Sequence, residues 1–143
     1  MRFWDENTGA LLLSGKARLV PHMTTEEVCN ACRLLTGQPA MPPDRVDEDT
    51  VCFPVFSVPG GRLSCICLMR GGTLHAVELQ VAAVGKRARP DAGRQRAFLF
   101  RCLYGDDPAK DSQRGVLLRC PFGTALVATD PRSGDATLRI TYR

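Results

Sequence analysis

Two closely spaced cysteine pairs are the first residues of this sequence that could do chemistry. Cys29 and Cys32 form a C-x-x-C pair in a segment with helical periodicity, and Cys65 and Cys67 alternate in a strand-like run. A C-x-x-C pair is reactive where it opens a helix directly after a strand, because the helix dipole there lowers the thiol pKa. Cys29 instead lies in the second helical turn behind two glutamates, which disfavour a thiolate. We interpret the first pair as core packing, with metal binding and redox chemistry as the alternatives.

A metal site would need more ligands than either pair supplies. Zinc takes four ligands, so the C-x-x-C pair would need two partners at a suitable spacing. Cys65 and Cys67 point to the same side of a strand, but they lie about 7 Å apart along it, which makes them a poor clamp. The sequence therefore predicts no metal and no cofactor.

All seven cysteines are expected to be reduced thiols. They are Cys29, Cys32, Cys52, Cys65, Cys67, Cys102 and Cys120. The count is odd, most of them lie in apolar runs and no export signal is visible, whereas a disulfide framework is typical of exported chains with loop cysteines. We expect them to act as small buried side chains.

The two histidines, His22 and His75, offer little for catalysis. A Cys/His mechanism needs a base beside the thiol, and only His75 lies in a predicted strand. It shares the apolar face of that strand with Val77 and Leu79, which favours a structural, hydrogen-bonded histidine. Glu78 has no partner carboxylate at a recognisable spacing, and phosphate-binding, serine-hydrolase and metalloprotease motifs do not occur. The sequence thus predicts a non-enzymatic protein.

Positive charge is concentrated in one segment. Residues 86–101 hold six cations and one acid, a net charge of +5 in a chain of net charge +4, so the rest of the chain sums to −1. The candidate partner-binding residues are Lys86, Arg87, Arg89, Arg94 and Arg96. Such a cluster binds phosphates or an acidic protein surface, and a solvated loop and helix face has the same composition. No exposed aromatic alternates with the arginines, as base-stacking proteins require, so a protein partner is favoured over nucleic acid.

The first helix is marked at both ends. Thr24 with Glu27 three residues later predicts a capping box, and Gly37 is typical of a helix C-terminus. Between these ends, apolar residues recur at helical spacing on one face. Val28, Cys32 and Leu35 share this face, with Ala31 and Leu34 beside them.

Strands make up most of the rest of the chain. An apolar strand over 9–13, continued over 16–20 after a turn, precedes the first helix, and a second helix covers about 94–104. The other predicted strands are 51–58, 62–69, 73–84, 116–120, 124–129 and 136–143. Gly- and Pro-marked turns between these runs indicate antiparallel hairpins. The predicted fold class is α+β, in the order β-α-β-β-β-α-β-β-β, with two helices packed on one face of a mostly antiparallel meander sheet.

Length and composition fit one globular domain over residues 1–143. The chain is 44% hydrophobic and 24% charged, which is ordinary for a folded domain. The N-terminus lacks the apolar run of roughly 7–15 residues that an export signal needs. No stretch approaches the roughly 20 apolar residues that span a bilayer. We expect a cytoplasmic protein with no membrane association.

The pattern of turns in the last third resembles a known class of small bacterial proteins. A short helix ends in Leu103-Tyr104-Gly105. Two turns follow, at Pro121-Phe122-Gly123 and at the Asp-Pro-Arg-Ser-Gly of 130–134. The closing strand ends in Ile140-Thr141-Tyr142. This pattern is similar to immunity proteins of contact-dependent and polymorphic toxin systems. The resemblance implies a protein that binds and blocks a toxin with a shaped surface. Inhibitors of nucleases are often acidic, whereas this chain is mildly basic, so the toxin is expected to be acidic or neutral at the contact.

The main functional hypothesis is therefore a non-enzymatic protein-binding module, an immunity protein that binds and neutralises a cognate bacterial toxin. The alternative is a small-ligand or nucleic-acid-binding domain that uses the basic segment 86–101. A cysteine- or metal-dependent enzyme is the third hypothesis.

Overall fold

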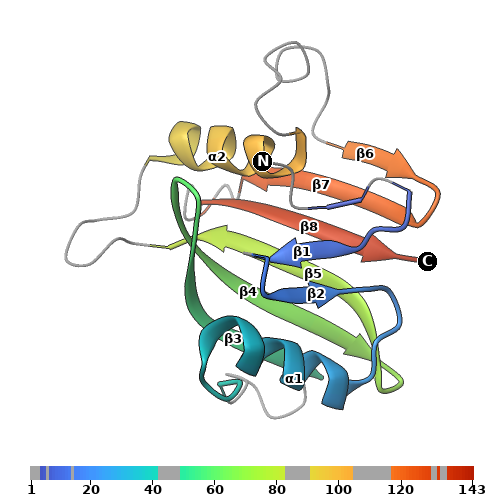
Figure 1. The fold of residues 1–143 in the computed structure, drawn as a ribbon. Coiled ribbons are helices and arrows are strands. Elements are labelled where there is room, and N and C mark those ends of the chain that lie inside the picture. The colour runs from blue at the N-terminus through green and yellow to red at the C-terminus, as the bar shows by residue number, and fades with distance from the viewer. Residues whose placement is uncertain are drawn as a thin grey trace.

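The main element of the fold is a six-stranded antiparallel sheet (Figure 1). The computed structural model describes residues 4–5, 7–13, 15–41, 49–82, 91–104, 117–129, 132 and 135–143. The strands of this sheet are β3 (Thr50–Val58), β4 (Gly61–Arg70), β5 (Thr73–Val81), β6 (Leu117–Cys120), β7 (Gly123–Thr129) and β8 (Ala136–Tyr142). With two helices on the sheet, the α+β class and the antiparallel pairing predicted from the sequence are confirmed.

The sheet consists of two three-stranded meanders. Its strand order is β3-β4-β5-β8-β7-β6. The second meander therefore joins the first through its last strand, β8, which pairs with β5. Val77 lies opposite Ile140 at this junction. The hairpins follow from local turn residues, but nothing local specifies which strand of the second meander joins the first. That choice is made by packing, because the alternating apolar side chains of β8 suit an interior position.

The N-terminal residues form a separate two-stranded sheet rather than one strand. β1 (Leu11–Leu13) and β2 (Ala17–Leu19) pair antiparallel, with Leu11 opposite Leu19. In each strand the first and third side chains are buried and the middle one is exposed. The hairpin therefore covers part of the main sheet with one apolar face.

An aromatic cluster fastens the N-terminal segment to the main sheet. The ring of Phe122 makes edge contacts with Trp4 and Tyr142, at centroid distances of 5.5 and 5.8 Å. The hydroxyl of Tyr142 donates a 2.9 Å hydrogen bond to the carbonyl of Gly9. Burial raises the pKa of Tyr142, so the phenol keeps the proton that this bond requires.

Helix α1 (Thr25–Thr36) has the ends that the sequence predicts. The N-cap Thr24 and Glu27 exchange two hydrogen bonds of 3.2 Å, and Gly37 ends the helix in a left-handed conformation. Its buried residues are Val28, Ala31, Cys32 and Leu35. Leu34, which we placed beside this face, is 68% exposed. The reason is geometric, since the sixth residue after Val28 lies outside an i, i+3, i+4, i+7 stripe.

Helix α2 (Ala92–Tyr104) begins two residues before the predicted start. Phe98, Leu99, Phe100 and Cys102 are buried. Gln95 is the one polar side chain buried among the described residues. It accepts a 3.0 Å bond from the backbone of Ala136 and so ties the helix to the start of β8.

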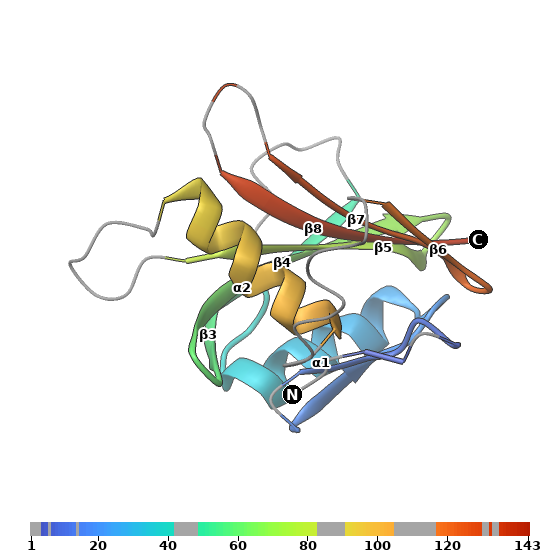
Figure 2. The ribbon, with the colours of Figure 1, turned by 90° about the horizontal axis from the view of Figure 1, so that it is seen from above.

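The helices and the β1–β2 hairpin lie on the same side of the main sheet (Figure 2). α1 packs against β2 and β3, and α2 packs against β7 and β8. The hydrophobic core fills the space between these elements and the inner face of the sheet. No described element covers the other face, which we call the open face. Among the described residues, no helix is long and apolar enough to cross a membrane.

Candidate functional site

The predicted basic surface is only partly described by the structure. Lys86, Arg87 and Arg89 lie outside the described residues. Arg94 and Arg96 lie on α2 and are exposed to solvent. Their role in binding a partner stays a prediction.

The described arginines of α2 make only weak local contacts. Arg94 lies 3.8 Å from Asp91 in an ion pair whose side chains are 82% and 72% exposed. The guanidinium of Arg96 lies over the ring of Phe100, 5.4 Å from its centroid. Exposed pairs of this kind contribute about 0–1 kcal/mol to folding. These side chains can therefore change partners at little cost to stability.

The C-x-x-C pair lies in the middle of α1, not at its N-terminus. The Cys32 side chain is fully buried and its sulfur lies 3.8 Å from the carbonyl oxygen of Gln38. Burial raises the pKa of Cys32, which makes its thiol a poorer nucleophile. The position and the surroundings of Cys32 agree with the packing role predicted for the pair.

Cys65 and Cys67 lie closer together than strand spacing suggests. Both are buried on the inner face of β4, and their sulfur atoms are 4.0 Å apart. The hydrogen bond with Cys67, together with burial, raises the pKa of Cys65 well above its ordinary value. No group of three or more potential metal ligands occurs among the residues that the structure describes.

All seven cysteines are free thiols in the structure. In the native protein we expect Cys29, Cys52 and Cys120 to react first with iodoacetamide, because they are partly exposed. The buried thiols should react at least tenfold more slowly, and Cys102 most clearly so, since burial raises its pKa to about 12. Mass spectrometry of time points checks the order.

Denaturation without reductant provides the control for this labelling experiment. All seven cysteines should then be alkylated. A pair that resists alkylation until a reductant is added would contradict the assignment of free thiols.

His75 does not lie on the apolar face of its strand, and the prediction that it does is wrong. Leu74 pairs with Met69, while Ala76 pairs with Leu68, so His75 is the extra residue of a β-bulge. A bulge interrupts strict alternation of side chains. Burial and then Arg70 and Arg139 lower the pKa of His75, and both arginines are outward residues of the sheet. His75 therefore belongs to the open face.

The open face carries a row of side chains that crosses all six strands. The strand register places these residues side by side in the order Cys52, Ile66, Glu78, Arg139, Leu126 and Leu117. Glu78 and Arg139 form a 3.1 Å ion pair at the centre, with side chains 25% and 43% exposed. Aliphatic side chains flank this pair on both sides. The row is apolar at its flanks and charged in the middle, a composition suited to a protein contact.

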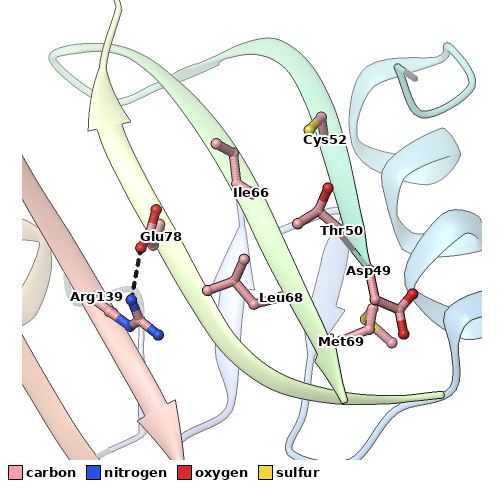
Figure 3. Close-up of a pocket in the computed structure, with 8 residues that line it drawn as sticks. All are labelled: Asp49, Thr50, Cys52, Ile66, Leu68, Met69, Glu78 and Arg139. Atoms are coloured by element: carbon pink, nitrogen blue, oxygen red, sulfur yellow. Dashed lines mark hydrogen bonds and ion pairs between the residues drawn. The ribbon is translucent and has the colours of Figure 1, made fainter. Parts of the chain in front are cut away.

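A hollow of about 430 Å³ lies beside this row (Figure 3). Its lining includes Ile66 and Leu68 of β4, with Asp49 at one side and the Glu78–Arg139 pair at the other. The hollow thus has an aliphatic floor and charged groups at its rim. A hollow of this kind can receive a side chain of a bound molecule.

Sequence reasoning missed the open face because its residues are distant along the chain. The signal that was available is the alternation within each strand, which places Glu78 and Arg139 outward in separate segments. Only the pairing of β5 with β8 brings them together. The basic segment, by contrast, is contiguous and stands out in composition alone.

Comparison with known proteins identifies a fold and no family. No family model and no curated protein matches the chain. The chain is similar to one chain of the solved structure "Rhs1-CT in complex with cognate immunity protein RhsI1". The TM-score is 0.59 with 16% sequence identity, over 100% of this chain and 88% of the other. This fold occurs in a toxin–immunity complex. The turns in the last third of the sequence resemble those of immunity proteins. The fold likeness leads to the same class of complex.

Proposed function

We propose that this chain is a bacterial immunity protein, a single non-enzymatic domain that binds and neutralises a toxin domain in the cytoplasm. The observation that carries the proposal is the full-length fold likeness to a chain of a toxin–immunity complex. That likeness covers 100% of this chain at a TM-score of 0.59.

The chemistry of the described side chains supports a binding role. The thiols of Cys32, Cys65 and Cys102 are buried and have raised pKa values, so they are poor nucleophiles. The charged groups at the centre of the open face, Glu78 and Arg139, are paired with each other. A paired carboxylate and guanidinium on a broad face suit recognition of a surface.

Co-expression with a candidate toxin tests the proposal. The candidate is the protein encoded directly upstream of the gene for this chain. Cells that express the toxin domain alone should stop growing, and cells that also express this chain should grow as well as cells without the toxin. The purified proteins should form a stable complex in size-exclusion chromatography.

A variant that lacks residues 136–143 is the negative control, because it loses an interior strand and should give no protection. Absence of both a complex and protection would contradict the proposal. Tight binding of this chain to RNA or DNA that weakens steeply with salt would favour the nucleic-acid alternative instead.

A further inference from the structure

We infer that the open face of the six-stranded sheet is the docking surface for the partner, and that the partner presents an acidic protein surface to it. The inference rests on the proposed function and names the surface through which it acts. The same fold also presents the exposed side of α2 on the opposite side of the sheet (Figure 2). A partner docked flat against one of these surfaces does not reach the other, so the two can be distinguished.

The charges of the open face favour an acidic partner. Its described arginines are Arg62, Arg70, Arg119, Arg139 and Arg143, and its described carboxylates are Asp49 and Glu78. Strand alternation places the arginines of β4, β6 and β8 outward. Among the described residues, five cations against two anions leave an excess of +3 on this face. Complementary charge on the partner would accelerate association and exclude basic competitors.

Three of these arginines gather at one end of the sheet. Arg70 lies at the β4–β5 hairpin, Arg119 lies next to the β6–β7 hairpin, and Arg143 follows the end of β8. All three are exposed. Near this end, burial and then Arg70 and Arg139 lower the pKa of His75. The basic end of the face is therefore formed by three strands that are remote in sequence.

The centre of the face supplies the apolar contact that a protein interface needs. Ile66, Leu68 and Leu126 are partly exposed, and Leu117 is 46% exposed at the β6 edge. The hollow at Ile66 and Leu68 is open to a side chain of the partner, with Arg139 at its rim for a neighbouring carboxylate. Interfaces combine such an apolar centre with a polar rim.

Nucleic acid fits this face less well than a protein does. The described aromatic side chains Trp4, Phe122 and Tyr142 pack together on the covered side. The phenylalanines of β3 and α2 are buried in the core. Base stacking on exposed aromatics, which single-stranded nucleic acid uses, is therefore missing from the described part of the face.

Two matched double variants locate the interface. Arg119→Glu with Arg143→Glu changes the open face, and Arg94→Glu with Arg96→Glu changes α2. Each pair reverses two exposed arginines and alters the net charge equally. Both should melt close to the wild-type temperature, because exposed charges contribute little to folding. The probe is the candidate toxin of the co-expression test, and biolayer interferometry measures its association and dissociation rates.

We expect the open-face variant to bind the toxin domain at least about tenfold more weakly, mainly through slower association and with a smaller dependence on salt. The α2 variant should stay within about twofold of the wild type, a result that would contradict the partner-binding role predicted for Arg94 and Arg96 from the sequence. Ile66→Asp, which places a carboxylate in the hollow, should weaken binding further in the same direction.

Each other outcome is decisive. If the α2 variant loses binding and the open-face variant does not, the open face is not the docking surface, and the proposed immunity function still stands. A wild-type protein that neither binds the toxin domain nor protects cells from it contradicts the function itself. The wild type could instead bind labelled single-stranded RNA or duplex DNA tightly, with an affinity that falls steeply as salt rises. If the open-face variant lost that binding, the surface would be assigned to nucleic acid.

Discussion

Deletion of residues 136–143 is expected to leave a chain that does not unfold cooperatively. These residues include all of β8, which lies inside the sheet and pairs with both β5 and β7. Leu138, Ile140 and Tyr142 are at most 2% exposed. Each such side chain contributes about 1.5–3 kcal/mol by burial, against a total stability of about 5–15 kcal/mol for a domain. Circular dichroism during heating should show no sigmoidal transition.

The effect of this deletion exceeds the loss of its own side chains. β8 is the strand through which the two meanders meet, so its removal leaves the backbone groups of β5 and β7 without partners on that side. Unpaired strand edges invite aggregation. A truncated chain that still melted cooperatively near the full-length temperature would show that the two meanders do not depend on β8.

Single substitutions on adjacent residues of β8 provide the control. Ile140→Ala removes an inward side chain and should cost about 2–5 kcal/mol. Thr141→Ala changes the next, outward side chain and should cost about 0.5 kcal/mol or less. If both variants lost the same free energy of unfolding, the assignment of inner and open faces would be wrong.

Local signals account for the elements that the sequence predicted well. The ends of α1 follow from Thr24, Glu27 and Gly37, which act within a few residues of themselves. The inward residues of β8 follow from strict alternation within one strand. Hairpins follow from turn residues between neighbouring strands. Each of these features is decided by residues that lie close together along the chain.

Non-local packing accounts for what the sequence did not reveal. The Glu78–Arg139 ion pair joins residues 61 positions apart, and the Gln95–Ala136 bond joins residues 41 apart. The bulge at His75 is defined only by its pairing with β4. No local pattern contains the strand order that creates these contacts. The candidate docking face could therefore be assembled only once the register of all six strands was known.

Gly123→Ala is also expected to destabilise the fold strongly. Gly123 opens β7, has a φ of +153° and pairs with Tyr142 of β8. A Cβ atom at this position would overlap the backbone carbonyl oxygen of Thr141, which cannot move without disturbing the β7–β8 pairing. Backbone strain of this kind costs about 1–3 kcal/mol, and the overlap adds to it. We expect a loss of about 3 kcal/mol or more and a fall in Tm of roughly 10 °C.

Gly72→Ala separates the steric overlap from the strain of the backbone. Gly72 also has a positive φ, of +78°, but an added Cβ would meet nothing within 4 Å. Its alanine variant should lose only about 1–2 kcal/mol, the cost of the left-handed conformation itself. Urea denaturation of the two variants measures the difference directly. A Gly123→Ala protein as stable as Gly72→Ala would mean that β7 and β8 can separate at Gly123 without loss, and that the close approach of their backbones there does not constrain the fold.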